Sequence, residues 1–84
     1  MEDLERLVVL RDGIQAVDEH ILKLLEQRVS FGKEIGEIKK KNGKPIYVPE
    51  VEKQKIEKLS AAATYPGLVE TIWPVIMCYT RSIE

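Results

Sequence analysis

The stretch that decides the fold is LERLVVLRDGIQAVDEHILKLLEQRVSFGKEIGEIK, residues 4–39. It contains no proline, and the good helix formers leucine, glutamate and lysine are frequent, so it predicts one long helix. Steps of alternating three and four residues select one face of this helix, here called the seam: Leu4, Leu7, Arg11, Ile14, Asp18, Ile21, Leu25, Arg28, Gly32, Ile35 and Lys39. Six of these residues are aliphatic, as in a buried helix–helix interface, but three are cations. Because an unpaired buried cation is costly, we expect an anion to meet the seam.

Composition narrows the class of protein. The 84 residues, 44% hydrophobic and 32% charged, suit a single folded domain over residues 1–84, near the lower size limit for a monomer. A net charge of −1 favours neither nucleic acid nor a membrane as a partner. One cysteine and one histidine make a disulfide or a metal site improbable, and we expect no metal and no cofactor. The acidic N-terminus lacks a signal-peptide pattern, and the apolar runs are short, so we expect a cytoplasmic protein.

The rest of the chain predicts two shorter helices. A basic run followed by Asn42-Gly43 is a typical helix C-terminus. Pro49 fits the first position of a second helix, over about residues 49–62. A third helix begins at about residue 66 or 67 and runs to the end, where the interior Pro74 predicts either a kink or a late start of the regular helix. The predicted fold is all-α, with one very long and two shorter helices.

The length of the first helix predicts a homodimer. At 1.5 Å per residue it is about 54 Å long, more than two short helices can cover, so an intertwined dimer with antiparallel long helices is expected. Arg28 and Lys39 are about 16 Å apart along the axis, whereas Arg11 is about 25 Å from Arg28. Antiparallel pairing about residue 22 would bring Arg11 of the partner subunit level with position 33, and so complete a three-cation cluster. Alternatively, salt bridges with Glu26 and Glu34 would account for these cations.

With these residues in place, the sequence resembles a known family over essentially its whole length, the all-helical AroQ-type chorismate mutases. The residues that carry the resemblance are Leu10-Arg11 followed by Ile14 and Asp18, Leu24-Leu25-Glu26-Gln27-Arg28, Gly36 with Lys39, and Lys44-Pro45-Ile46-Tyr47 leading to Glu52. Each piece alone is weak, but the set and its spacing are specific. The resemblance implies the rearrangement of chorismate to prephenate in phenylalanine and tyrosine biosynthesis, a pericyclic reaction that requires no cofactor.

The resemblance also implies roles for individual residues. Arg11 from the other subunit, Arg28 and Lys39 would hold the two carboxylates of chorismate, and Lys39 would also reach the ether oxygen. Glu52 would bind the ring hydroxyl, and Glu84 would contact the ether oxygen.

Three further positions bear on this assignment. Thr80 occupies a place where the family often has a small hydroxyl residue. Val48 and Val51 depart from the family, which usually has an aspartate and an arginine there. The loss of the arginine predicts weaker charge complementarity to a dianion.

These departures leave two other functions open. One is an isochorismate-pyruvate lyase on the same fold. The other is a weakly active regulatory domain that needs a shikimate-pathway enzyme as partner. Two residues also keep an interpretation without a role in the site. Glu84 could be a solvated C-terminal residue, and Glu52 could be a surface residue paired with Lys53 or Lys55.

Overall fold

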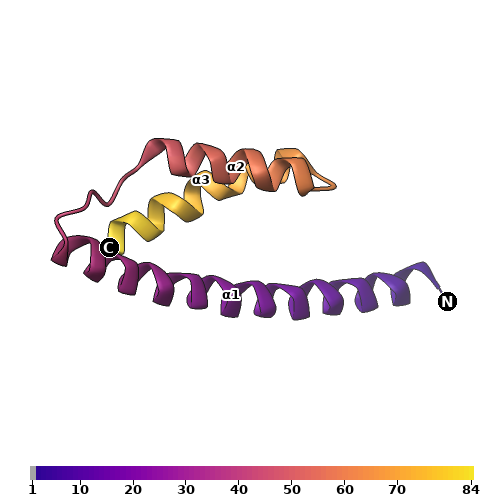
Figure 1. The fold of residues 1–84 in the computed structure, drawn as a ribbon. Helices are drawn as coiled ribbons and strands as arrows, with labels where there is room; N and C mark the ends of the chain where they lie inside the picture. Colours follow the sequence, from indigo (N-terminus) through magenta and orange to yellow (C-terminus); the bar gives the residue numbers. More distant parts are fainter. Residues whose placement is uncertain (1) are drawn as a thin grey trace.

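The computed structural model describes residues 2–84 and consists there of three helices without strands (Figure 1). Helix α1 spans Asp3–Lys41, α2 spans Pro49–Ala62 and α3 spans Pro66–Ile83. The prediction of an all-α fold with three helices is therefore confirmed.

Short-range sequence signals explain where α1 ends and α2 begins. The side-chain amide of Asn42 donates a hydrogen bond of 2.8 Å to the carbonyl of Ile38, and the backbone N–H of Asn42 donates another of 3.1 Å to the same oxygen. Gly43 follows with a φ of 65°, a left-handed conformation that glycine adopts without steric cost. Pro49 is the first residue of α2, where its missing N–H costs no helical hydrogen bond.

Pro74 does not delay the start of α3. The helix begins at Pro66, as predicted, and continues through Pro74 to Ile83, so of the two alternatives for Pro74 the late start is wrong. Proline at position 66 suits the first helical turn, whereas Pro74 leaves the carbonyl of Glu70 without its helical donor. Glu70 is exposed, and water can bond that carbonyl instead.

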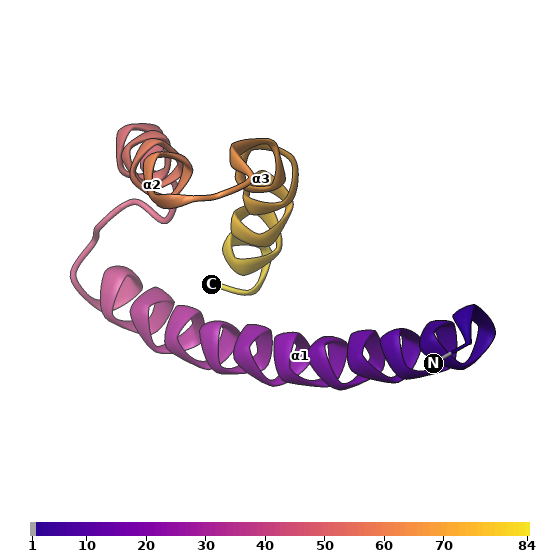
Figure 2. The ribbon, with the colours of Figure 1, turned by 90° about the vertical axis from the view of Figure 1, so that its right-hand side faces the viewer.

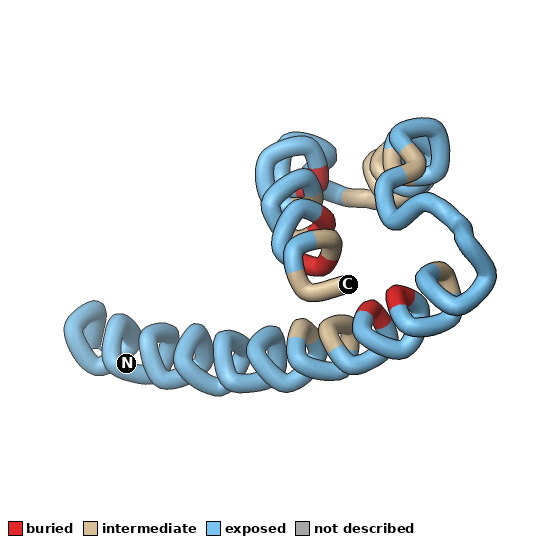
Figure 3. The backbone as a smooth tube through the Cα atoms, turned by 90° about the vertical axis from the view of Figure 1, so that its left-hand side faces the viewer, coloured by how far each residue is buried: buried red, intermediate tan, exposed pale blue. Residues whose placement is uncertain are grey.

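Helix α3 is the central packing element. It packs against α1 on one side and against α2 on the other, whereas α1 and α2 make no direct packing contact (Figure 2). Val69 and Met77 on α3 are 5% and 4% exposed, and they are the buried apolar side chains of the described residues. The buried positions of α1 are the two glycines Gly32 and Gly36, near its C-terminal end and facing α3 (Figure 3).

A single chain covers little of α1. Its radius of gyration is 17.1 Å, against about 12 Å for a compact domain of this length, and its extents are 60 × 25 × 16 Å. The N-terminal half of α1 extends beyond the other helices, and its large apolar side chains are exposed: Leu4, Leu7, Val8, Val9, Leu10, Ile14, Val17 and Ile21 (Figures 1 and 3). None of the three helices has the length and apolarity that crossing a membrane requires.

Candidate active site

One pocket collects most of the predicted site residues. It has a volume of about 500 Å³, within the range typical of small-molecule sites, and all three helices contribute to its wall. The predicted residues that line it are Arg28 and Lys39 from α1, Glu52 from α2, and Thr80 and Glu84 from the end of α3. Residues 52 positions apart in the sequence thus meet in one cavity.

The guanidinium of Arg28 lies against α3. Its Nη1 donates a hydrogen bond to the hydroxyl of Thr80, which in turn donates one of 3.0 Å to the carbonyl of Ile76. Thr80 is 8% exposed, so its hydroxyl is anchored within the helix and presents a lone pair to Arg28. This pair orients Arg28 at the pocket, and Arg28 makes no ion pair with Glu26 or Glu34 among residues 2–84.

Two glycines of α1 allow the end of α3 to lie this close. A Cβ added to Gly32 would lie 2.5 Å from Cγ2 of Thr80. A Cβ added to Gly36 would lie 2.8 Å from the Cα of Glu84. Gly32 also lines the pocket, so its missing side chain both allows close helix packing and leaves space in the cavity.

The side chain of Lys39 contacts both the loop after α1 and the residue at the end of α3. Its Nζ donates a hydrogen bond of 3.1 Å to the carbonyl of Ile46 and lies 3.9 Å from Oε2 of Glu84. The Glu84 side chain is only 9% exposed, and its Oε2 is buried without a hydrogen-bond partner within the described residues. The interpretation of Glu84 as a solvated terminal residue is therefore wrong, because α1 covers it.

Glu52 pairs with a residue that the sequence analysis did not select, Arg81. Nη1 of Arg81 donates to both carboxylate oxygens of Glu52, and the guanidinium lies 4.4 Å from the centroid of the Tyr47 ring. The hydrogen bond that Arg81 donates to Glu52 raises the pKa of Arg81 above its ordinary value, and desolvation opposes this in part. The alternative interpretation of Glu52, a surface residue paired with Lys53 or Lys55, is therefore wrong. Arg81 could have been found from its position one residue after Thr80, in the turn that also carries Glu84.

The remaining predicted residues divide into two groups. Val48 and Val51 line the pocket and contribute apolar wall where a charged side chain was expected from the resemblance. Arg11 is exposed on the N-terminal half of α1 and does not line the pocket of its own chain.

Within residues 2–84, no group of three or more His, Cys, Asp or Glu side chains is arranged to hold a metal ion.

The fold and the pocket define a small all-α protein in which cations and carboxylates from three helices face one cavity. Residues 10–84 match the family described as chorismate mutase type II, and this chain belongs to that family.

Curated relatives agree with the family assignment. A bifunctional chorismate mutase/prephenate dehydratase of Aquifex aeolicus is 48% identical over 56 residues, which are 67% of this chain and 16% of the relative. A T-protein of Enterobacter agglomerans is 37% identical over 75 residues, 84% of this chain and 20% of the relative.

A shorter relative is closer in length to this chain. A chorismate mutase of Methanocaldococcus jannaschii is 39% identical over 56 residues, 67% of this chain and 57% of the relative. The chain thus spans about a fifth or less of the first two relatives and somewhat over half of the third. No solved structure matches the chain significantly.

Proposed function

We propose that this chain is a cytoplasmic chorismate mutase, which converts chorismate to prephenate in the biosynthesis of phenylalanine and tyrosine. The observation that carries the proposal is the pocket itself. It brings Arg28, Lys39, Glu52 and Glu84 together from three helices, in a chain of the chorismate mutase type II family. The cations Arg28 and Lys39 at the wall of a small cavity suit a dianionic substrate, because charge-assisted hydrogen bonds to carboxylates are strong and directional.

The proposed reaction places few demands on the protein. The ether C–O bond of chorismate breaks while a C–C bond forms, and no proton, electron or group is transferred to the enzyme. The site has to hold a flexible dianion in its compact reactive conformer and stabilise the charge that builds on the ether oxygen. Arg28, held by Thr80, and Lys39, held by the carbonyl of Ile46, are fixed before the substrate arrives, which favours both tasks.

The ether oxygen would be met by Lys39 and Glu84. Their side chains lie 3.9 Å apart and enclose the end of the pocket between α1 and α3. Lys39 donates as a cation, whereas Glu84 can donate a hydrogen bond only in its protonated form. Glu52, on the opposite wall, would accept the hydrogen bond of the ring hydroxyl.

The active form would be a homodimer in which residues 1–84 form a single helical domain. The exposed apolar seam of α1 and the radius of gyration of 17.1 Å support this proposal, because a monomer would leave that surface in water. With the long helices antiparallel, Arg11 of the partner subunit would approach the pocket near Arg28 and Lys39. Each subunit would then contribute one cation to the site of the other.

The decisive experiment is an assay of prephenate formation with the purified chain and its Arg28→Ala variant. We expect activity in the wild type and a loss of about 100-fold or more in kcat/KM for the variant, comparable to removal of one preorganised donor. Lys40→Ala, an exposed α1 cation outside the pocket, is the matched control and should retain activity. A wild type that does not form prephenate would refute the proposal.

The same assay separates the other functions. Incubation with isochorismate, with detection of salicylate and pyruvate, tests the lyase activity. Weak turnover of chorismate that rises on addition of a shikimate-pathway enzyme would instead indicate a domain that depends on a partner.

A further inference from the structure

We propose that Arg81 is a positioning residue of this site. Its guanidinium pairs with the Glu52 carboxylate and holds it toward the pocket, so that a site with two carboxylates can accept a dianion. The inference rests on the proposed function and extends it to a residue that had no role in it. Arg81 comes from α3 and adds a second cation to the α2 side of the pocket, which Lys55 of α2 also lines.

The charge balance of the pocket is the first support. Its charged side chains are the cations Arg28, Lys39, Lys55 and Arg81 and the carboxylates Glu52 and Glu84. Lys39 lies near Glu84, and Arg81 bonds Glu52, so each carboxylate has its own cation. Without Arg81, Glu52 would face a dianionic substrate without its ion-pair partner, and like charges at close range repel each other.

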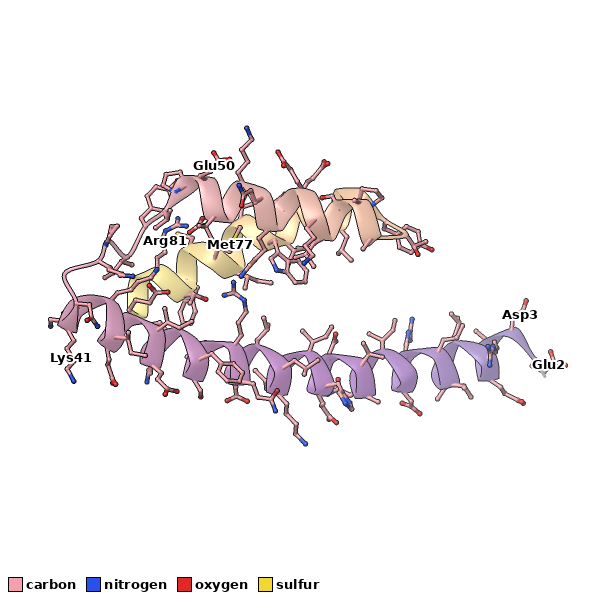
Figure 4. All side chains as sticks on the ribbon, viewed as in Figure 1. Glu2, Asp3, Lys41, Glu50, Met77 and Arg81 are labelled. Carbon is pink, nitrogen blue, oxygen red and sulfur yellow. The ribbon has the colours of Figure 1, made fainter. Side chains whose placement is uncertain are left out.

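The geometry of α3 is the second support. Successive residues of a helix are rotated by about 100°, so Arg81 leaves the helix in a different direction from Thr80 and Glu84. Those two residues face α1, whereas Arg81 reaches the first turn of α2, where Glu52 lies (Figure 4). One turn of α3 therefore serves both walls of the pocket.

The guanidinium is also preorganised. The Tyr47 ring lies 4.4 Å from its central carbon, and planar stacking of this kind restricts the orientation of an arginine. Only Nη1 donates to Glu52, and the other N–H groups of Arg81 have no acceptor among residues 2–84. A carboxylate has about four acceptor positions, so Glu52 keeps capacity for a hydroxyl of the substrate.

A purely structural role for the pair would have a different signature. The side chains of Arg81 and Glu52 are 27% and 24% exposed, and ion pairs that water reaches contribute little to stability. If the pair were purely structural, its removal would change neither the melting temperature nor the activity much, or it would lower both together. A positioning role affects substrate binding with little change in melting temperature.

The test is a double-mutant cycle of Arg81→Ala and Glu52→Gln, with KM and kcat for chorismate, inhibition by prephenate and melting temperature measured for each variant. We expect Arg81→Ala to raise KM by about 10-fold or more and to change kcat less, because it leaves a repelling carboxylate. Adding Glu52→Gln should recover part of that KM, since the amide removes the charge and keeps an acceptor. Arg81→Lys, which keeps the charge, should lie between the wild type and Arg81→Ala.

Lys53→Ala, an exposed cation next to Glu52 and outside the pocket, is the matched control. An active wild type with an unchanged KM in Arg81→Ala would overturn this inference alone, as would a loss that Glu52→Gln does not recover. A wild type without prephenate formation would overturn the proposed function and, with it, this inference.

Discussion

At the scale of single residues, the Glu84 carboxyl lies 3.9 Å from Nζ of Lys39 at the pocket. If Glu84 meets the ether oxygen of the substrate as a hydrogen-bond donor, Glu84→Gln, a permanent donor, should retain activity. The measurement is kcat/KM for prephenate formation of both proteins, and a loss of about 100-fold or more in Glu84→Gln would contradict the role.

Thr80 permits a second prediction at this scale. Thr80→Val keeps the shape of the side chain but removes the acceptor of the Arg28 hydrogen bond. A hydrogen bond to a charged group contributes about 1.5–3 kcal/mol, so we expect kcat/KM to fall by about 10-fold or more. Thr71→Val is the control. Thr71, like Thr80, donates a hydrogen bond to the backbone carbonyl four residues earlier, here that of Gly67, but it lies exposed on α3. Equal activity of the two variants would show that Arg28 does not depend on Thr80.

At the scale of secondary-structure elements, the close approach of α3 to α1 depends on Gly36. In Gly36→Ala the new methyl group would lie 2.8 Å from the Cα of Glu84, and backbone cannot move aside as a flexible side chain can. We expect a loss of about 1–3 kcal/mol in unfolding free energy from overpacking. A shift of about 1 Å in catalytic groups can cost about 100-fold in rate, and we expect a loss of that order in kcat/KM.

Gly13 provides the matched control for this prediction. An added Cβ at Gly13 meets nothing within 4 Å, so Gly13→Ala should stabilise the helix by about 1 kcal/mol through helix propensity alone. Chemical denaturation and the prephenate assay on both variants measure the two effects. A Gly36→Ala protein as active as Gly13→Ala would mean that the contact with Glu84 is unimportant.

At the scale of the whole molecule, the proposed homodimer leads to a prediction for Arg11. If Arg11 serves the site of the other subunit, Arg11→Ala and Arg28→Ala homodimers should each be nearly inactive. Mixing them under conditions of subunit exchange should restore about a quarter of wild-type activity, because half of the dimers are mixed and each has one complete site. Restoration requires that the two arginines come from different chains. Mixing without any restoration, although exchange is demonstrated, would place both arginines in one chain.

Sequence periodicity was sufficient for the elements and for much of the site. The seam of α1 revealed Arg28 and Lys39, because a cation on an otherwise aliphatic face stands out from its neighbours. The family resemblance added Glu52, Thr80 and Glu84, and the structure brings all five to one pocket. The predicted start of α3 at about residue 66 is confirmed, and of the two alternatives for Pro74 the late start is wrong, because the helix continues through Pro74.

What the sequence by itself determined is local. It comprises the three helices, the end of α1 at Asn42-Gly43, the start of α2 at Pro49 and the cations of one helix face. These follow from hydrogen bonding and side-chain spacing within a few residues. Only the tertiary structure decided that Arg81 forms a hydrogen bond with Glu52 and that the backbone of Glu84 packs closely against Gly36. Both contacts join separate helices, and they depend on the distance and angle at which α3 packs between α1 and α2, a global result of packing that no local spacing contains.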